Sequence, residues 1–259
     1  MARIFVTGST TGLGLAAAQT LVDGGHRVIG HARNEQRASD LGPLREPFDR
    51  IVIGDLADLA DTRRIADTVN ALGRLDAVLH NAGVYVDTDR NLTADGHPRL
   101  LAVNVLAPYL LTALIDRPAR LVYLSSGMHT SGRAVLDDLD WHDRPWNGVQ
   151  AYCDSKLLVT TLAAAIARYW PDVRSNAVDP GWVPTRMGGP DATDDLALGH
   201  DTQVWLATSD DPATNTTGQY WYHRQTHTPA PAVHDIAFQG ALLDKLAGIT
   251  GEALPRRGL

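Results

Sequence analysis

The stretch RIFVTGSTTGLG, residues 3–14, decides the fold of this chain. Its first part, Arg3 to Thr7, is typical of a short buried strand, and apolar residues at helical spacing begin directly after Gly14. A strand, a glycine turn and a helix in this order leave the amino end of the helix open to an anion, because its first N–H groups and its dipole point there. The stretch predicts the first βα unit of a parallel sheet, with a phosphate-binding turn.

The glycines of this turn are spaced G-x-x-x-G-x-G, which departs from the G-x-G-x-x-G of many dinucleotide-binding folds. Glycine lets a backbone approach a phosphate closely. A tight βα turn without a ligand would use glycines too, but the strand before it and the helix after it favour cofactor binding. The turn residues expected to contact the cofactor are Gly8, Ser9, Thr10, Thr11, Gly12, Leu13 and Gly14.

Six further strands are expected, each ending in small or polar residues. Their ranges are 26–31, 51–54, 75–79, 121–124, 173–178 and 218–223. Helical patterns are expected at 15–22, 58–72, 98–115, 152–170, 194–207 and 235–246. This alternation predicts an α/β fold: a single domain over residues 1–259 with a Rossmann-like, doubly wound parallel sheet of about seven strands and helices on both faces. Ligands of such sheets bind at the carboxyl ends of the strands.

The residues after the second strand bear on the choice of cofactor. An acidic residue at this place would bind the ribose 2′-hydroxyl of NAD(H) and repel a 2′-phosphate. The chain has Arg33 instead, and a guanidinium can pair with that phosphate. We therefore expect NADP(H) to be preferred over NAD(H); the alternative is that Arg33 is only a surface side chain.

Tyr152 and Lys156 are four residues apart at the start of a long helical pattern. Their side chains would lie on one face of the helix, one turn apart. A phenol ordinarily titrates near a pKa of ~10, and a nearby ammonium favours the phenolate, so the pair could give and take a proton near neutral pH. The same spacing also occurs on solvated helix faces, so its meaning depends on whether the chain builds a cofactor site.

Composition excludes several classes of protein. The 259 residues are 44% hydrophobic and 20% charged, which is ordinary for a globular domain. The net charge of −7 gives no reason to expect nucleic acid or a membrane as a partner. The chain runs directly into a strand, with no signal peptide and no long apolar run, so we expect a cytoplasmic protein. No metal is expected, because the ten histidines do not cluster, and the single cysteine, Cys153, is expected to pack rather than to react.

Together, these motifs resemble those of the short-chain dehydrogenase/reductase family, and the resemblance covers nearly the whole chain. The glycine turn looks like its T-G-x-x-x-G-x-G, residues 81–83 like its N-A-G, and Tyr152 with Lys156 like its Y-x-x-x-K. The resemblance implies catalytic roles for Asn104, Ser126, Tyr152 and Lys156, with Ser125 as the alternative to Ser126. It implies further cofactor contacts from Asp55, Leu56, Asn81, Ala82, Gly83, Tyr152, Lys156, Pro180, Gly181, Val183 and Thr185. Within the family, residues 93–96, 138–141 and 151–157 are similar to retinol dehydrogenases and protochlorophyllide reductases.

The family likeness also implies a reaction. NADP(H) would exchange a hydride with a small-molecule carbonyl or alcohol. Ser126 would bind the substrate oxygen, Tyr152 would be the general acid/base, and Lys156 would lower its pKa and hold the ribose, while Asn104 would position a water. Reduction of a carbon–carbon double bond at the same site remains an alternative, as does a non-catalytic dinucleotide-binding regulator.

Two segments carry no motif that could name the substrate. These are a long insert at about 127–149, expected to be a substrate loop, and a Gly/Pro/Asp-rich stretch at about 183–207, expected to be a lid. The helices at 98–115 and 152–170 form a dimer or tetramer face in many relatives. A homodimer or homotetramer is therefore expected, unless the insert covers that face.

Overall fold

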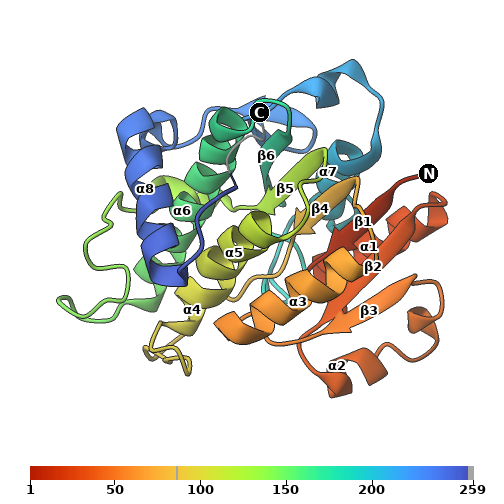
Figure 1. Ribbon diagram of the computed structural model, residues 1–259, viewed down its shortest axis with the longest axis horizontal. Coiled ribbons are helices and arrows are strands. Elements are labelled where there is room, and N and C mark those ends of the chain that lie inside the picture. The colour runs from red at the N-terminus through yellow and green to blue at the C-terminus, as the bar shows by residue number, and fades with distance from the viewer. Residues whose placement is uncertain (86, 256–259) are drawn as a thin grey trace.

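The computed structural model describes residues 1–85 and 87–255, and its centre is an eight-stranded sheet (Figure 1). The strands are β1 (Arg3–Val6), β2 (Arg27–Ala32), β3 (Arg50–Ile53), β4 (Ala77–His80), β5 (Arg120–Leu124), β6 (Arg174–Asp179), β7 (Tyr220–Tyr222) and β8 (Gln225–His227). Their order is β3-β2-β1-β4-β5-β6-β7-β8, and all neighbours are parallel except β7 and β8. The order reverses between β1 and β4, which is where such sheets bind nucleotides.

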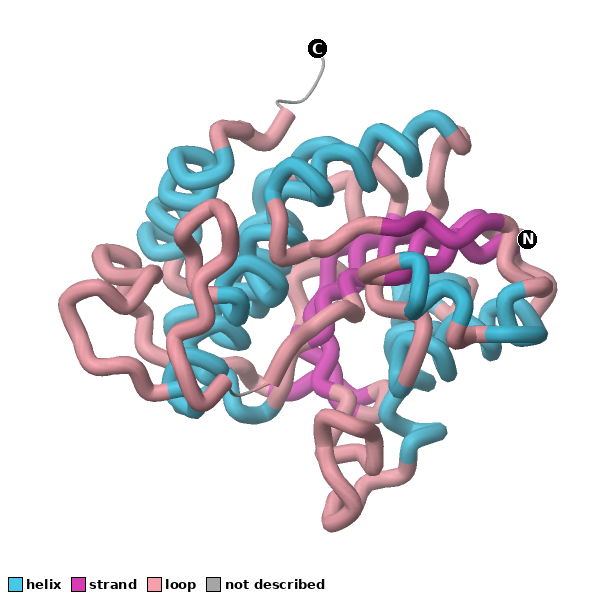
Figure 2. The backbone as a smooth tube through the Cα atoms, turned by 90° about the horizontal axis from the view of Figure 1, so that it is seen from below, coloured by secondary structure: helices cyan, strands magenta, loops and turns pink. Residues whose placement is uncertain are grey.

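The helices cover both faces of the sheet (Figure 2). The longer ones are α1 (Gly12–Asp23), α3 (Leu59–Ala71), α5 (Ala107–Leu114), α6 (Gly148–Tyr169), α7 (Leu196–Thr208) and α8 (Ile236–Thr250). Side chains of one strand alternate between faces. Phe5 packs into the cluster shared with α3, α5, α6 and α8, whereas Ile4 and Val6 pack into the cluster shared with α1 and α7. The predicted doubly wound α/β fold is confirmed.

The sheet has one strand more than predicted. β8 turns back from β7 through His223 and Arg224, both at positive φ (47° and 58°). The three residues of β8 are polar and fully at the surface, so no apolar alternation marks them in the sequence. The short α2 (Glu35–Ser39) was also not predicted; it buries only Ala38.

The helix predicted at 98–115 is interrupted in the middle. It consists of α4 (Arg99–Leu101), one π-helical turn at Ala102–Leu106 and α5. Pro108 explains the interruption, because it has no N–H to donate to the carbonyl of Asn104 four residues earlier. The amide of Ala107 bonds five residues back, to Ala102. The irregular turn therefore contains Asn104, one of the predicted catalytic residues.

The insert is only partly irregular. A 3₁₀ turn (Gly127–Ser131) follows β5, a loop spans 132–147, and α6 begins at Gly148, before the predicted start. The predicted lid is divided as well: 183–195 is a loop, while α7 packs against α1 and buries Gly199, Thr202 and Trp205. The roles of both segments in substrate binding stay predictions.

Helix α6 is enclosed by its own chain. Every residue of 151–167 is buried, beneath the 3₁₀ turn at 127–131, a second one at Pro231–His234, and α8. The α6 part of the face expected to bind another copy is therefore covered, and the homodimer or homotetramer stays a prediction. In the part of the chain that the structure describes, we find no helix with the length and apolar character needed to cross a membrane.

Candidate active site

The glycine turn lies at the carboxyl end of β1 and packs tightly on the turn after β4. Gly8 and Gly12 have positive φ (65° and 56°), which glycine adopts without strain. A Cβ on Gly14 would be 2.3 Å from both the Nδ2 of Asn81 and the carbonyl oxygen of Gly8. Thr185 lies against Gly12, 3.5 Å from the position of a Cβ there. The turn is therefore shaped so that no side chain fills it.

The first turn of α1 is open to an anion. Thr11 stands at the N-cap position in extended conformation and makes no side-chain capping bond. The first turn contains no acidic residue. The first N–H groups of a helix have no partner within the helix, and the helix dipole adds positive potential there. These features fit a cofactor pyrophosphate.

Two buried polar residues fasten β1 to β4. The amide nitrogen of Ala82 donates to the Thr7 hydroxyl (2.9 Å), and the Nδ2 of Asn81 donates to the Thr7 carbonyl (3.1 Å). The predicted N-A-G segment is thus joined to the end of β1, and its contact with the cofactor stays a prediction.

His31 is a residue of this edge that the sequence did not single out. Its buried ring accepts a hydrogen bond from the Gly8 amide at Nδ1 (3.0 Å) and bonds the Gly54 carbonyl through Nε2 (2.8 Å). Burial lowers the pKa of His31, which agrees with a neutral ring bearing its proton on Nε2. His31 therefore joins the glycine turn to the turn before Asp55.

The residues predicted to bind the adenosine lie beyond this bridge. Asp55 is half-buried, and its carboxylate accepts a hydrogen bond from the Ala57 amide (3.0 Å). Leu56 is buried beside it. Arg33 is exposed immediately after β2.

Asn104 and Lys156 both lie beside Gly83. A Cβ on Gly83 would be 3.5 Å from the Oδ1 of Asn104 and 3.6 Å from the Nζ of Lys156. The Oδ1 of Asn104 accepts from the Val84 amide (2.9 Å), and its Nδ2 lies 3.1 Å from the Oγ of Ser155. Both side chains are almost fully buried.

Ser126 faces Tyr152, whereas Ser125 does not. Ser125 is buried and shares a hydrogen bond with Thr160 (2.5 Å). Ser126 caps the 3₁₀ turn that follows it, and its Oγ accepts from the amide of Met128 (3.2 Å). Ser126 is also close enough to Tyr152 for its hydroxyl to lower the pKa of the phenol. This geometry favours Ser126 over the alternative that the sequence left open.

The proton affinities of Tyr152 and Lys156 differ from expectation. Burial raises the pKa of Tyr152, and the nearby Ser126 hydroxyl, which could donate to the phenolate, opposes this effect. Burial lowers the pKa of Lys156 to about 8, with the Asp179 carboxylate acting in the opposite direction. The Nζ of Lys156 is 5.6 Å from the centre of the Tyr152 ring and donates to the Leu124 carbonyl (2.8 Å). The pKa of Tyr152 is thus raised by desolvation, contrary to the predicted lowering by Lys156.

Two further residues near Tyr152 were not predicted. The ring of Tyr85 meets the ring of Tyr152 edge-on, with centroids 4.8 Å apart, and is 42% exposed. Asp179 accepts from the hydroxyl of Tyr220 (2.9 Å) and from the Gly181 amide (3.0 Å). Asp179 stands directly before the predicted Pro180-Gly181, and this adjacency was the only signal in the sequence.

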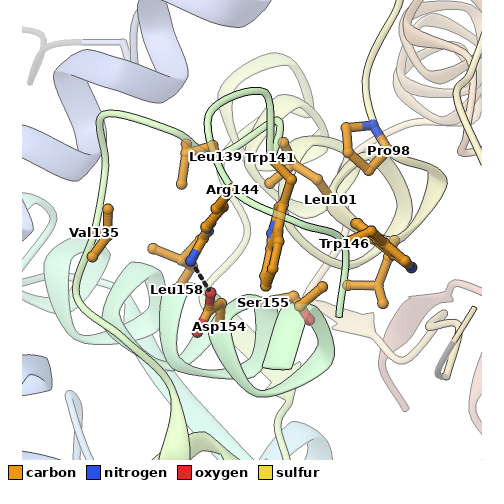
Figure 3. A pocket seen from close by; sticks show the side chains of 12 residues that line it. Pro98, Leu101, Val135, Leu139, Trp141, Arg144, Trp146, Asp154, Ser155 and Leu158 are labelled. Atoms are coloured by element: carbon orange, nitrogen blue, oxygen red, sulfur yellow. Dashed lines mark ion pairs between the residues drawn. The ribbon is translucent and has the colours of Figure 1, made fainter. Parts of the chain in front are cut away.

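The loop at 132–147 packs on α6 (Figure 3). The guanidinium of Arg144 lies 3.6 Å from the Trp141 ring and 3.2 Å from the Asp154 carboxylate, which also accepts from the Arg133 amide (2.8 Å). The apolar hollow beneath it is lined by Leu101, Val135, Leu139 and Leu158, among others. Neither Tyr152 nor Ser126 lines this hollow. Trp141 of the loop and Tyr152 nevertheless belong to one apolar cluster, with Trp146 packed against it, so the loop also packs beside Tyr152.

A protein-family model described as short chain dehydrogenase matches residues 2–195. This chain belongs to that family. Short-chain dehydrogenases are oxidoreductases that use a nicotinamide dinucleotide, and the glycine turn and open helix end described above fit such a cofactor. The predicted enzyme class is confirmed.

Curated relatives support the same assignment. The chain is 38% identical to the short-chain dehydrogenase chyC of Penicillium rubens, covering 98% of this chain and all of the relative. It is 33% identical to the putative daunorubicin C-13 ketoreductase DnrU of a Streptomyces species, covering 96% and 92%. It is 32% identical to human retinol dehydrogenase 13 over 71% of this chain and 60% of the relative, which agrees with the predicted retinol dehydrogenase-like branch.

Solved structures share the fold. A protein from Mycobacterium paratuberculosis superposes with a TM-score of 0.84 at 26% identity, covering 98% of this chain and 95% of the other. A metagenomic blue fluorescent protein in complex with NADPH superposes with a TM-score of 0.71 at 22% identity, covering 85% and 95%.

Proposed function

We propose that this protein transfers a hydride between NADP(H) and a carbonyl or alcohol, with Tyr152 as the general acid/base. The observation that carries the proposal is the grouping of four residues: Ser126 and Lys156 are both close to Tyr152, and Lys156 and Asn104 both lie beside Gly83. All four residues lie at the carboxyl end of the sheet, on the side of the glycine turn.

The cofactor, when bound, supplies or accepts the hydride at its nicotinamide ring. The chain supplies the proton and the charge stabilisation. Because the Ser126 Oγ accepts from the Met128 amide, its own proton is free to point at a substrate oxygen, where charge develops during reduction. Tyr152 then donates its proton to that oxygen. A raised pKa keeps Tyr152 protonated, which suits reduction.

Lys156 is placed to hold the cofactor ribose. Its ammonium has three donors, and the Leu124 carbonyl uses one of them. Asn104 bonds the backbone of Val84 with both ends of its amide, which fixes the turn beside Lys156. Removal of either residue would disturb the position of the nicotinamide relative to Tyr152.

Arg33, which is exposed directly after β2, supports the preference for NADP(H) because its guanidinium could pair with the 2′-phosphate. Thr185, Val183, Pro180 and Gly181 would line the nicotinamide side. The exposed ring of Tyr85 beside Tyr152 would contact the substrate, and it suits an apolar or aromatic group next to the carbonyl. The relative DnrU is named as a ketoreductase, which agrees with a carbonyl substrate.

Replacement of Tyr152 by Phe tests this proposal. The ring and its contact with Tyr85 remain and only the hydroxyl is lost, so NADPH binding should persist while turnover falls by about 10² or more, the scale of a lost general acid. Turnover is measured by NADPH oxidation with a panel of ketones and aldehydes, beside a panel of enones. Tyr109→Phe is the matched control, since that hydroxyl bonds the Glu252 carbonyl far from the cleft. Near wild-type turnover in Tyr152→Phe would refute the role of Tyr152, and activity with enones alone would point to double-bond reduction.

A further inference from the structure

A buried histidine lies beneath Ser126, and the mechanism above does not use it. His129 is the third residue after Ser126 and is 1% exposed. Its Nδ1 is 2.8 Å from the Ser126 carbonyl oxygen, and its Nε2 is 3.0 Å from the Ala230 amide nitrogen. A carbonyl can only accept and an amide N–H can only donate, so the ring is neutral and carries its proton on Nδ1. Both ring nitrogens of His129 are therefore hydrogen-bonded to the backbone.

The other end of this link is firmly anchored. Ala230 is 101 residues further along the chain and is itself buried. It stands before the 3₁₀ turn at Pro231–His234, which packs on α6. Ala230 and Val233 share an apolar cluster with Leu157, the neighbour of Lys156. His129 thus ties the Ser126 turn to a segment that is held against the catalytic helix.

A second contact holds the same turn. The ring of Tyr220 lies 4.5 Å from the ring of His129, and its hydroxyl donates to the Oδ2 of Asp179 (2.9 Å). A Cβ on Gly127 would be 3.1 Å from that same Oδ2. The peptide after Ser126 is therefore packed between His129 and the carboxylate of Asp179.

These contacts decide where the Ser126 hydroxyl points. The Ser126 carbonyl accepts from the His129 amide (3.0 Å) as well as from its ring, so the orientation of this peptide is set twice. The Oγ, in turn, is held by the Met128 amide of the same turn. A rotation of the peptide would move the hydroxyl away from Tyr152.

We propose that His129 is a positioning residue: it holds Ser126 against the segment at Ala230 so that the serine hydroxyl meets the substrate oxygen. This rests on the proposed function, in which Ser126 donates to that oxygen. The energetic reason is that a misplacement of about 1 Å can cost on the order of 10² in rate.

The first test compares two substitutions of His129 with a control. His129→Leu removes both hydrogen bonds, and kcat should fall by about 10- to 100-fold, with the Kd for NADPH unchanged. His129→Asn keeps an amide donor near the position of Nδ1 and should restore most of kcat. His26→Leu is the control, because His26 also accepts a backbone amide, that of Ala2, but at the opposite edge of the sheet.

A double-substitution cycle separates positioning from a general loss of structure. If His129 acts through Ser126, then His129→Leu should cost nothing further in a protein that already carries Ser126→Ala. A merely structural role would lower kcat by the same factor in both backgrounds. That second outcome overturns the proposal.

Ala230→Pro provides a test that keeps the His129 side chain, should His129→Leu fail to fold. Ala230 has φ −54°, which proline adopts, but the substitution removes the N–H that reaches Nε2 and puts the proline Cδ in its place, so the His129 ring must move away. We expect a several-fold loss of kcat and an unchanged Kd for NADPH. Absence of turnover in the wild-type protein would refute the proposed function and this inference with it. An active wild type whose kcat survives both His129→Leu and Ala230→Pro would refute the inference alone.

Discussion

The glycine turn at 8–14 and the loop at 132–147 are held in place in different ways. The glycine turn is fixed by neutral, buried hydrogen bonds: Gly8 to His31, and Ala82 to Thr7. The loop is fixed by charges. Arg144 pairs with Asp154 (3.2 Å) and Asp138 (3.4 Å), and His97 pairs with Asp140 (2.7 Å).

The difference separates a fixed part of the protein from an adjustable one. Backbone sterics and neutral hydrogen bonds change little with salt or pH, so the cofactor would meet the same turn under most conditions. Ion pairs near the surface are screened by salt and depend on protonation. We expect the loop to vary in conformation and in sequence, while the turn does not.

The largest difference in NADPH affinity is expected when one methyl group is added to each region. Gly14→Ala would place a Cβ 2.3 Å from the Gly8 carbonyl, and we expect the Kd for NADPH to rise at least about 1,000-fold, or about 4 kcal/mol. Gly132→Ala would clash comparably with the carbonyl of Cys153 (2.6 Å), but it should change that Kd less than about threefold, well under 1 kcal/mol. Fluorescence titration with NADPH measures both. Equal losses would show that the two regions are not independent.

Charge removal from the loop should affect stability rather than cofactor affinity. Arg144→Met leaves the buried Asp154 with the Gln150 amide and the Arg133 N–H but without a cation. We expect a loss of about 2 kcal/mol in the free energy of unfolding, since an unpaired buried charge is costly. Adding Asp154→Asn to the Arg144→Met protein should restore much of the lost free energy of unfolding, because the buried carboxylate charge is then removed as well. If Arg144→Met left the free energy of unfolding unchanged but weakened NADPH binding, the proposed difference between the loop and the glycine turn would be wrong.

On the turn side, the only charge expected to matter is that of Arg33. NADPH should bind at least tenfold more tightly than NADH, about 1.4 kcal/mol, and Arg33→Ala should remove most of this preference. Arg27→Ala is the control, because Arg27 lies at the other end of β2 and pairs with Asp49. Equal affinities of the wild type for the two cofactors would disprove the predicted NADP(H) preference.

The smallest effect expected is the pH dependence of the His97–Asp140 pair. The hydrogen bond to Asp140 raises the pKa of His97, and the protonated pair is stabilising. Its contribution is complete below the unfolded pKa of ~6.5 and is lost as pH rises through the higher folded value. Compared with His97→Gln, the wild type should be more stable by less than about 1 kcal/mol at pH 6 and by nearly nothing at pH 9. Thermal unfolding at both pH values measures the difference, and a constant difference would contradict this account.

The sequence was most informative where structure is local. All seven predicted strands exist, because buried parallel strands are short apolar runs ending in turn residues. Tyr152 and Lys156 could be placed together because helical spacing alone brings them onto one face. The glycine turn was equally readable, since positive φ and close packing leave glycine as the fitting residue.

What the sequence could not show depends on contacts across long separations. His31 and His129 act through backbone groups 23 and 101 residues away, and a lone histidine in a strand or turn gives no sign of such a partner. The rise in the pKa of Tyr152 also follows from burial, which spacing does not reveal. Similarly, the enclosure of α6 results from 3₁₀ turns and α8 that meet only in the folded chain.

Strand β8 has a consequence for behaviour at high concentration. A sheet that ended at β7 would expose a row of unpaired backbone groups beside Trp221, and such an edge can recruit strands from other chains. The hairpin return covers that row with three polar residues, Gln225, Thr226 and His227. Arg224, at its tip, is held by the hydroxyl of Thr202 on α7 (2.9 Å), so the cover is fastened in place. We expect this edge of the sheet to resist intermolecular strand pairing and amyloid-like aggregation.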